Sequence, residues 1–304
     1  MSKTLYTTFA SLVIASLAIG CASIANLTEK GAQLAAKTGV ISAQHADSLA
    51  KSSKAIAKAA EDITPEQEYY IGRSVGALIL KSYKAYDNKQ LNQYLNTMGQ
   101  ALAAASDKPE TYGGYHFLVL DTDEINGFAA PGGLIFVSRG LLRCCKSEDD
   151  LAAILAHEIG HVQHGHGLNA IDKSRLTSAL TTLGAEAAKS FGPEQVGELT
   201  TAFEGSLKDI MSTMVTSGYA RKYETQADAT AVTLLKRIGY DPNGLKRVLK
   251  TISAHQKPDD KGFAKTHPDP NVRIKDIEPL LQDHKASPAP AARTKRFKKA
   301  LTNV

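Results

Sequence analysis

Residues 155–167 read LAHEIGHVQHGHG and place four histidines and one glutamate in what the pattern predicts to be one helix. An α-helix turns about 100° per residue, so the side chains of His157 and His161 lie about 40° apart, one turn along the same side. Glu158 points to the neighbouring face, where its carboxylate can hold a water on a metal without binding the metal. This HExxH spacing predicts that His157 and His161 bind Zn²⁺ and that Glu158 acts on the water.

The two remaining histidines of this stretch do not fit the same ion. His164 lies on the correct face but about 10 Å along the axis from His157, because each residue adds about 1.5 Å. The long metzincin consensus places glycine at 164 and histidine at 167, whereas this chain has His164 and Gly167. We therefore expect His164 and His166 at the helix end or in contact with the metal ligands, and Gly165 and Gly167 to end the helix.

A zinc peptidase needs a third protein ligand and an open position for water. The segment 223-YETQAD-228 places Glu224 and Asp228 four residues apart, on one face of an expected helix. One carboxylate can bind the ion, while the other accepts the free N–H of a ligand histidine and fixes its tautomer. Glu224 is therefore the expected third ligand. The alternative is an ordinary acidic surface helix.

The rest of the chain is mainly helical in pattern, with a short strand-forming region. A helix capped by Thr64 is expected to continue to about Ser106. Two β-type runs follow, Tyr115–Asp121 and Leu134–Ser138, separated by TDEINGFAAPGG. Ser147 then opens a capping box, SEDD, ahead of the HExxH helix. These patterns predict an α+β fold, mostly helical, with a small mixed or antiparallel sheet next to that helix.

The N-terminus resembles a bacterial secretion signal. Its apolar run, Leu5–Ile19, is shorter than the roughly 20 residues that span a membrane. The ending LAIGC resembles a lipobox, in which Cys21 becomes the lipidated first residue, although Ala18 stands where leucine is commonest. Residue 22 is alanine rather than aspartate, which resembles the pattern of lipoproteins sent to the outer membrane. The alternative is an ordinary signal cleaved elsewhere, with Cys21 incidental.

We expect four segments: a lipoprotein signal peptide over 1–20, a helical tether or strut over 21–61, a zinc metallopeptidase domain over 62–285 and a basic tail over 286–304. The tail has five basic residues and no acid. We expect it to be solvated, although it could touch anionic lipid. No basic face interleaved with aromatics is evident, which argues against nucleic-acid binding. Cys144 and Cys145 are expected as two small, partly buried thiols, and a strained disulfide between neighbours is the alternative.

Several motifs occur in an order that resembles peptidase family M48. They are HEIGHV, ARKYETQAD, GYDP and THPDPNVRI, preceded by TPEQEYYIG and INGFAAPGGLIFVSRGLL, and they span about residues 62–280. This is the gluzincin family of HtpX, the CAAX-prenyl endopeptidases and periplasmic lipoproteins such as BepA. The resemblance implies a zincin-type metallopeptidase domain that holds one Zn²⁺ per chain. It implies that the zinc ligands are His157, His161 and Glu224, with Glu158 as general base and Asp228 beside a ligand histidine.

The resemblance also implies a substrate-binding strand. INGFAAPGG resembles the edge strand along which gluzincins bind substrate as an added β-strand, through backbone hydrogen bonds that make little demand on sequence. Asn126 holds the position whose side chain contacts the substrate backbone, and Phe128 follows in the strand. The usual alanine after the asparagine is Gly127 here. We therefore expect a looser strand at this point.

His267, in THPDPNVRI, has no role that spacing alone can assign. In relatives resembling BepA the matching histidine reaches the zinc, with the arginine that corresponds to Arg273 nearby. His267 is thus expected either to close the fourth zinc position at rest or to donate to the oxyanion. A surface-loop histidine is the alternative.

The expected function is that of a zinc endopeptidase, exported and lipid-anchored on the periplasmic face of a Gram-negative outer membrane, that cleaves misfolded or stalled envelope proteins. The sequence lacks the multiple spans of HtpX and the tetratricopeptide repeats of BepA, so partner docking is expected to use 22–62 or the mostly helical stretch 168–218. The competing hypothesis is an envelope assembly factor or chaperone that has a zinc site and little turnover. Zinc binding alone does not need Glu158, which favours the peptidase. Client identity and oligomeric state stay open.

Overall fold

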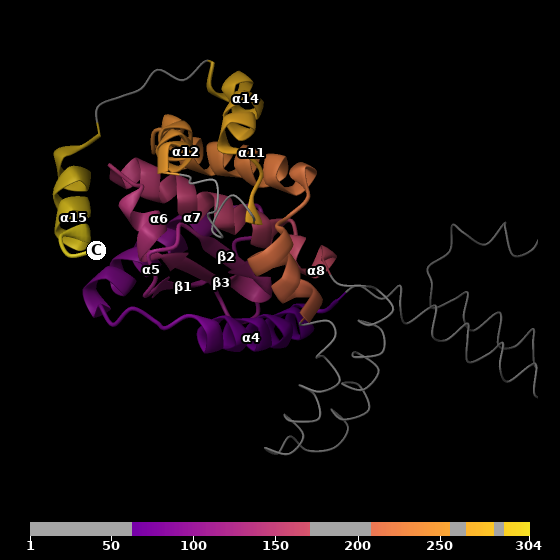
Figure 1. Ribbon diagram of the computed structural model, residues 1–304. Coiled ribbons are helices and arrows are strands. Elements are labelled where there is room, and N and C mark those ends of the chain that lie inside the picture. Colours follow the sequence, from indigo (N-terminus) through magenta and orange to yellow (C-terminus); the bar gives the residue numbers. More distant parts are fainter. Residues whose placement is uncertain (1–62, 171–207, 256–265, 283–288) are drawn as a thin grey trace, which may run out of the picture. The chain divides into compact units, whose positions relative to one another are not determined.

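The structure is a computed structural model that describes residues 63–170, 208–255, 266–282 and 289–304 (Figure 1). From Thr64 onward these residues belong to one unit, Thr64–Asp172 together with Phe203–Val304. The expected signal peptide, Cys21, the tether 21–61 and most of the stretch 168–218 lie outside the described residues. Within the described part, no helix has the length and apolar character required to cross a membrane.

A small mixed sheet packs against α7 (Glu148–Gln163), the helix that carries the HExxH residues. Its strands are β1 (His116–Leu120), β2 (Gly127–Ala130) and β3 (Leu134–Ser138), in the order β1-β3-β2. β1 runs parallel to β3, and β2 runs antiparallel to it. The central strand β3 carries the apolar run LIFVS, as a strand with two bonded neighbours requires. The predicted α+β class with a small mixed sheet is confirmed.

Two helices precede the sheet. α4 (Pro65–Ser82) begins with a capping box between Thr64 and Gln67. α5 (Lys89–Ala104) begins at Asn88, whose side chain accepts a hydrogen bond from the Leu91 amide. The prediction of one continuous helix to about Ser106 was wrong, because residues 83–88 are extended and Ala85 pairs with Leu120 at the end of β1.

Helix α7 (Glu148–Gln163) carries the HExxH residues and packs along α11 (Arg221–Arg237). The predicted capping box is present, since Ser147 and Asp150 satisfy each other's backbone amides. All residues of α7 from Glu148 to Val162 are buried, so nothing on this helix faces open solvent before its last turn. The remaining elements are α6 (Arg139–Arg143), η1 (Pro131–Gly133), α8 (His166–Asn169), η2 (Ser212–Ser217), α12 (Asn243–His255), α14 (Pro270–Leu281) and α15 (Ala291–Leu301).

The C-terminal segment differs from the solvated tail that the sequence predicts. Within 286–304, α15 packs beside α5 and α7 and buries Phe297 (Figure 1). Arg296 pairs with the buried carboxylate of Glu148, which also accepts hydrogen bonds from the hydroxyls of Tyr94 (2.8 Å) and Tyr240 (2.9 Å). The basic charge of the segment therefore neutralises an acid at the start of α7. A count of charges along the sequence could not reveal that partner.

Cys144 and Cys145 are both free and buried. Burial raises the pKa of the Cys144 thiol to about 11, and it raises that of Cys145 well above the ordinary value. Both thiols therefore stay protonated and behave as small apolar side chains. The structure has no disulfide between these two neighbours, which was the alternative to two separate thiols.

Candidate functional site

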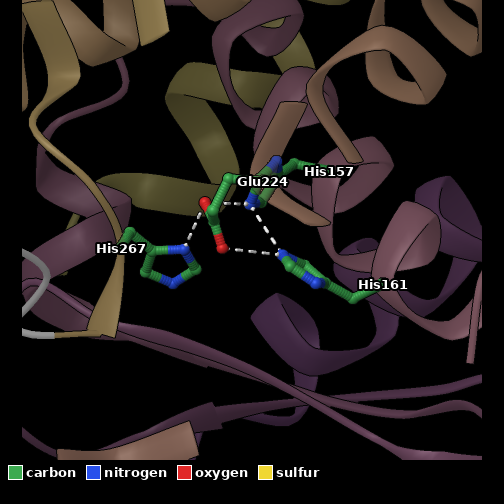
Figure 2. Close-up of side chains that lie close together, drawn as sticks. All are labelled: His157, His161, Glu224 and His267. Atoms are coloured by element: carbon green, nitrogen blue, oxygen red, sulfur yellow. Dashed lines mark hydrogen bonds and ion pairs between the residues drawn. The ribbon is translucent and has the colours of Figure 1, made fainter. Parts of the chain in front are cut away.

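Four side chains from three parts of the chain converge on one point (Figure 2). His157 and His161 come from α7, Glu224 comes from α11, and His267 comes from the segment just before α14. One nitrogen or oxygen atom from each lies within 4.8 Å of the others. All four side chains are buried. The structure thus brings together the three ligands predicted from the sequence and adds His267, so the alternative of a surface-loop histidine was wrong.

The packing of α7 on α11 sets these distances. The i, i+4 spacing on α7 places the Nε2 atoms of His157 and His161 3.1 Å apart. From α11, the Glu224 carboxylate places Oε2 3.6 Å from His157 Nε2 and Oε1 3.3 Å from His161 Nε2. His267 Nδ1 lies 2.9 Å from Glu224 Oε2 on the other side of the carboxylate.

The donor atoms fit a metal ion. His157 Nδ1 lies 2.9 Å from the Asp228 carboxylate, which can only accept, so the His157 proton lies on Nδ1 and its Nε2 offers a lone pair. Glu224 Oε1 receives no hydrogen bond from any described residue, although His161 Nε2 lies beside it. Buried acceptor atoms gathered this closely form an arrangement that a bound cation would stabilise. Imidazole nitrogens with a carboxylate oxygen form a set that divalent transition metals bind.

Asp228 and Arg273 hold this arrangement from behind. Arg273 donates to both carboxylate oxygens of Asp228, from Nε at 2.8 Å and from Nη2 at 2.6 Å. This is the bidentate geometry that an arginine fork favours. Burial opposes ionisation of Asp228, but Arg273 outweighs it and lowers the Asp228 pKa to about 2. Burial, reinforced by the Arg273 charge, lowers the His157 pKa to about 3, which keeps this imidazole neutral and able to bind a metal.

The two glutamates of the site have opposite electrostatic environments. Burial raises the pKa of Glu158 above its ordinary value. Burial also opposes the ionisation of Glu224, but His267 and Arg273 outweigh it and hold the Glu224 pKa well below the ordinary range. Glu224 is thus a permanent anion suited to bind a cation, whereas Glu158 is suited to take up a proton. Such divergence between neighbouring carboxyl groups is typical of sites where one binds and the other exchanges protons.

Gly127 lies directly against the Glu158 carboxylate. A Cβ atom added at Gly127 would come within 2.6 Å of Glu158 Oε1, closer than real side chains approach. The sequence predicts a looser strand at this glycine. The structure shows instead that the missing side chain leaves room for the glutamate, so this glycine sets where the carboxylate lies.

The other expected substrate-binding residues are occupied by contacts within the chain. Asn126 Oδ1 accepts hydrogen bonds from the Gly127 amide (2.9 Å) and from Thr266 Oγ1 (3.1 Å). Phe128 is buried, and the centroid of its ring lies 5.5 Å from that of Tyr83. Thr266 immediately precedes His267, so one short segment contacts both the edge strand and the metal cluster. The site is closed in this structure.

The last two histidines of this stretch, His164 and His166, flank a glycine whose backbone is left-handed. Gly165 has φ of 63° and separates α7 from α8. On an uninterrupted helix His166 would point about 140° away from His161. The break turns it back, and His166 Nδ1 lies 2.9 Å from His161 Nδ1. His164 caps α7 and its Nε2 lies 2.9 Å from Thr230 Oγ1. His166 thus contacts a ligand histidine and His164 lies at the helix end, as the sequence predicts.

Tyr219 is also part of the site, although no sequence motif pointed to it. Its ring stacks on the His161 imidazole, with centroids 4.4 Å apart and an angle of 21° between the planes. Its hydroxyl is buried without a hydrogen-bond partner among the described residues. Burial, then the charges of Glu158 and Glu224, raise its pKa far above the ordinary value. A tyrosine five residues before Glu224 fits no catalytic motif, and only the fold shows where it lies.

Comparisons with known proteins agree with this geometry. The profile described as Peptidase family M48 matches residues 89–280, which include every residue of the cluster. The chain is 28% identical over 215 residues to the "Beta-barrel assembly-enhancing protease" of Yersinia pestis, and 28% identical over 211 residues to that of Escherichia coli K12. Each match covers 69% of this chain. It is also 34% identical over 160 residues, 52% of the chain, to the "Mitochondrial metalloendopeptidase OMA1" of Schizosaccharomyces pombe.

These matches cover only part of each relative. They span 43% of the Yersinia protein, 42% of the Escherichia protein and 44% of the yeast protein. The chain thus matches less than half the length of these curated relatives.

The geometry predicts how metal binding depends on each group. His157→Ala and Glu224→Ala should lose the bound metal and the thermal stability that it confers, because each removes a donor and metal binding contributes to folding. Asp228→Asn should weaken the metal affinity about 10–100-fold, since it disturbs the partner of His157. Metal analysis and chelator competition measure both effects.

His164→Ala is the matched control, because His164 lies on the same turn and contacts Thr230 rather than the cluster. It should bind metal as the wild type does. Loss of metal from the His164 variant, with Glu224→Ala unaffected, would contradict this description of the site.

Proposed function

The chain belongs to peptidase family M48, and on this premise we propose that it is a zinc-dependent endopeptidase of the cell envelope. The observation that carries the proposal is the position of Glu158. Glu158 directly follows the ligand His157 on α7, it is buried with a raised pKa, and it is not one of the four candidate ligands. A site that only stored a metal would not need such a group. A hydrolase needs a base held next to the ion.

The residues divide the chemistry among them. A bound Zn²⁺ would polarise the scissile carbonyl and lower the pKa of a water towards neutrality. Glu158 takes the proton of that water and passes it to the leaving amine, so that the amide C–N bond breaks and one water is consumed. Burial of Glu158 supports this exchange, because a raised pKa brings the carboxyl group closer to the pKa of its proton donor.

The edge strand β2 is the proposed binding site for the substrate backbone. Among the residues that the structure describes, β2 has one bonded neighbour, β3, and the Asn126 carbonyl accepts a hydrogen bond from the Ser138 amide. Because bonded positions alternate in an antiparallel pair, Gly127 and Ala129 direct their backbone groups away from β3. An extended peptide could pair with these groups and would need no fixed side chain. Its carbonyl would replace the Asn126 oxygen that now accepts from the Gly127 amide.

The closed geometry supports a latent resting state. His267 contacts Glu224, and Thr266 contacts Asn126, so the same segment covers both the cluster and the start of the edge strand. We assign His267 the fourth position on the metal at rest. The segment has to leave when substrate enters, because a buried cluster offers no path to a polypeptide chain.

The envelope location and the substrate class rest on other observations. The N-terminus resembles a lipoprotein signal that ends at Cys21. Two relatives are named for assembly of β-barrels. We therefore propose that the chain is anchored by lipid at Cys21 to the periplasmic face of the outer membrane and cleaves misfolded or stalled envelope proteins. An assembly factor with little turnover is the competing function, and the activity of Glu158 variants separates the two.

Replacing the proposed base should separate metal binding from turnover. Glu158→Gln should retain the full complement of zinc and lose about 10²–10⁴-fold in cleavage of casein or an unfolded protein, since general-base catalysis contributes about that factor. Metal analysis and a cleavage assay with and without chelator check this. Wild-type turnover in the Glu158 variant would remove the base assignment, and a chelator-insensitive wild type would remove the peptidase proposal.

Gly127→Ala should reduce turnover through Glu158. The added Cβ would displace the carboxylate, and a shift of about 1 Å in a reacting group can cost about 100-fold. Zinc content should not change, because Gly127 contacts none of the ligands predicted here. In a Glu158→Gln background the same substitution should cost nothing further, which a double-mutant cycle measures. An equal loss in both backgrounds would show that the glycine acts elsewhere.

His267→Ala should release the latent enzyme. We expect it to keep zinc through His157, His161 and Glu224 and to cleave casein, or itself, faster than wild type. Full zinc with cleavage reduced about 10²–10³-fold would favour an oxyanion role for His267 instead. Equal rates in the variant and the wild type would show that the segment opens freely.

Cys21→Ser should alter location without altering chemistry. The variant should appear as a soluble periplasmic form or an uncleaved precursor, with wild-type activity in detergent extracts. Cell fractionation and incorporation of labelled palmitate measure this. Identical fractionation of variant and wild type would contradict the lipid anchor.

A further inference from the structure

Tyr219 lies in the wall of the site between the HExxH helix and the His267 segment. Its ring stacks on His161, and its backbone amide donates to the Thr266 carbonyl at 3.3 Å. Gly218, with φ of 75°, precedes it and turns the chain from η2 towards α11. Two independent contacts therefore fix this tyrosine, one through its ring and one through its backbone.

The Tyr219 hydroxyl takes part in neither of these contacts. It is buried, and no residue in the described part of the chain accepts or donates a hydrogen bond to it. Buried hydroxyls nearly always have a partner, because water has been removed from them at a cost in free energy. Its ring lies against the His161 imidazole, with the His166 ring 6.0 Å away, so the tyrosine borders the candidate metal ligands rather than the apolar core. The missing partner is therefore expected among the reactants.

We propose that Tyr219 is a catalytic residue whose phenol donates a hydrogen bond to the oxyanion that forms when water attacks the scissile carbonyl. The assignment rests on the proposed peptidase function and adds a group to it. Attack on a peptide carbonyl places negative charge on its oxygen, and a fixed donor in a dry site stabilises that charge strongly. No other buried hydroxyl without a partner in the described part of the chain lies beside the cluster.

The surroundings suit a donor rather than a base. In its ordinary neutral form a phenol carries one O–H, which is the donor that a developing negative charge requires. The stacking on His161 fixes the ring, which leaves only the hydroxyl hydrogen free to rotate towards a developing charge. His267 then has no need to supply the oxyanion contact, which is consistent with its position on Glu224 at rest.

Tyr219→Phe tests the proposal, because it removes one oxygen atom and keeps the ring stack. In the full-length protein loaded with zinc, kcat for an unfolded protein should fall about 10²–10³-fold, with KM changed little. Affinity for a phosphinic peptide that mimics the tetrahedral oxyanion should fall with kcat, whereas affinity for zinc, measured by chelator competition, should not change. The melting temperature should stay the same or rise, since the lost hydroxyl has no partner in the fold.

Tyr223→Phe is the matched control. Tyr223 stacks on His166 at 4.5 Å, in the first turn of α11, and we assign it no contact with substrate. It should retain wild-type kcat and phosphinate affinity. Wild-type kcat in Tyr219→Phe, a lowered melting temperature, or weakened zinc binding would each overturn the proposal, since the last two would mark a structural group. If the wild type binds zinc but cleaves no substrate, the proposed peptidase function fails. That result differs from the three outcomes that would overturn only the role of Tyr219.

Discussion

The close approach of α7 to α11 is the constraint on which the site depends. A Cβ atom at Gly160 would lie 2.9 Å from the Ala227 Cα, so the backbones of the two helices approach each other closely at this point. Gly160 lies between the two histidines in sequence, and Ala227 lies between Glu224 and Asp228. A side chain at Gly160 would force the two helices apart and shift Glu224 relative to the two imidazoles. The glycine inside HExxH is therefore a packing requirement of this chain as well as a spacer.

Arg273 is the second element on which several groups depend. It pairs with Asp228, lies 3.4 Å from Glu224 Oε2 and approaches His157 Nδ1 at 3.2 Å. This buried cation thus favours the ionised form of Asp228, assists His267 in doing the same for Glu224, and adds to the burial that keeps His157 neutral. A buried charge is tolerated only where its partners satisfy it, and removing one partner leaves the rest uncompensated. Helix α14 contains none of the four candidate ligands, yet through Arg273 it affects the protonation of residues on α7 and α11.

The sequence predicts those parts of the site that local geometry controls. The i, i+4 pairs on α7 and α11, the capping boxes at Thr64 and Ser147, and the strand at Leu134–Ser138 all follow from periods and caps within a few residues. It could not predict contacts that only the packing of distant segments creates. The bond between Asn126 and Thr266 joins residues 140 positions apart, and the partner of Arg296 lies 148 positions away.

The two ends of α7 show how the fold distributes satisfied and unsatisfied groups. At the start of the helix, the buried Glu148 carboxylate has donors from Tyr94, Tyr240 and Arg296, so its charge is fully compensated. Near its end, Glu224 Oε1 and the Tyr219 hydroxyl face the cluster without hydrogen bonds from the described residues. A fold that satisfies its polar groups at one end of a helix can hold incomplete ones rigidly at the other, where reactants complete them. On this argument α15 acts on the site from a distance, because it holds the start of the helix that carries His157 and His161.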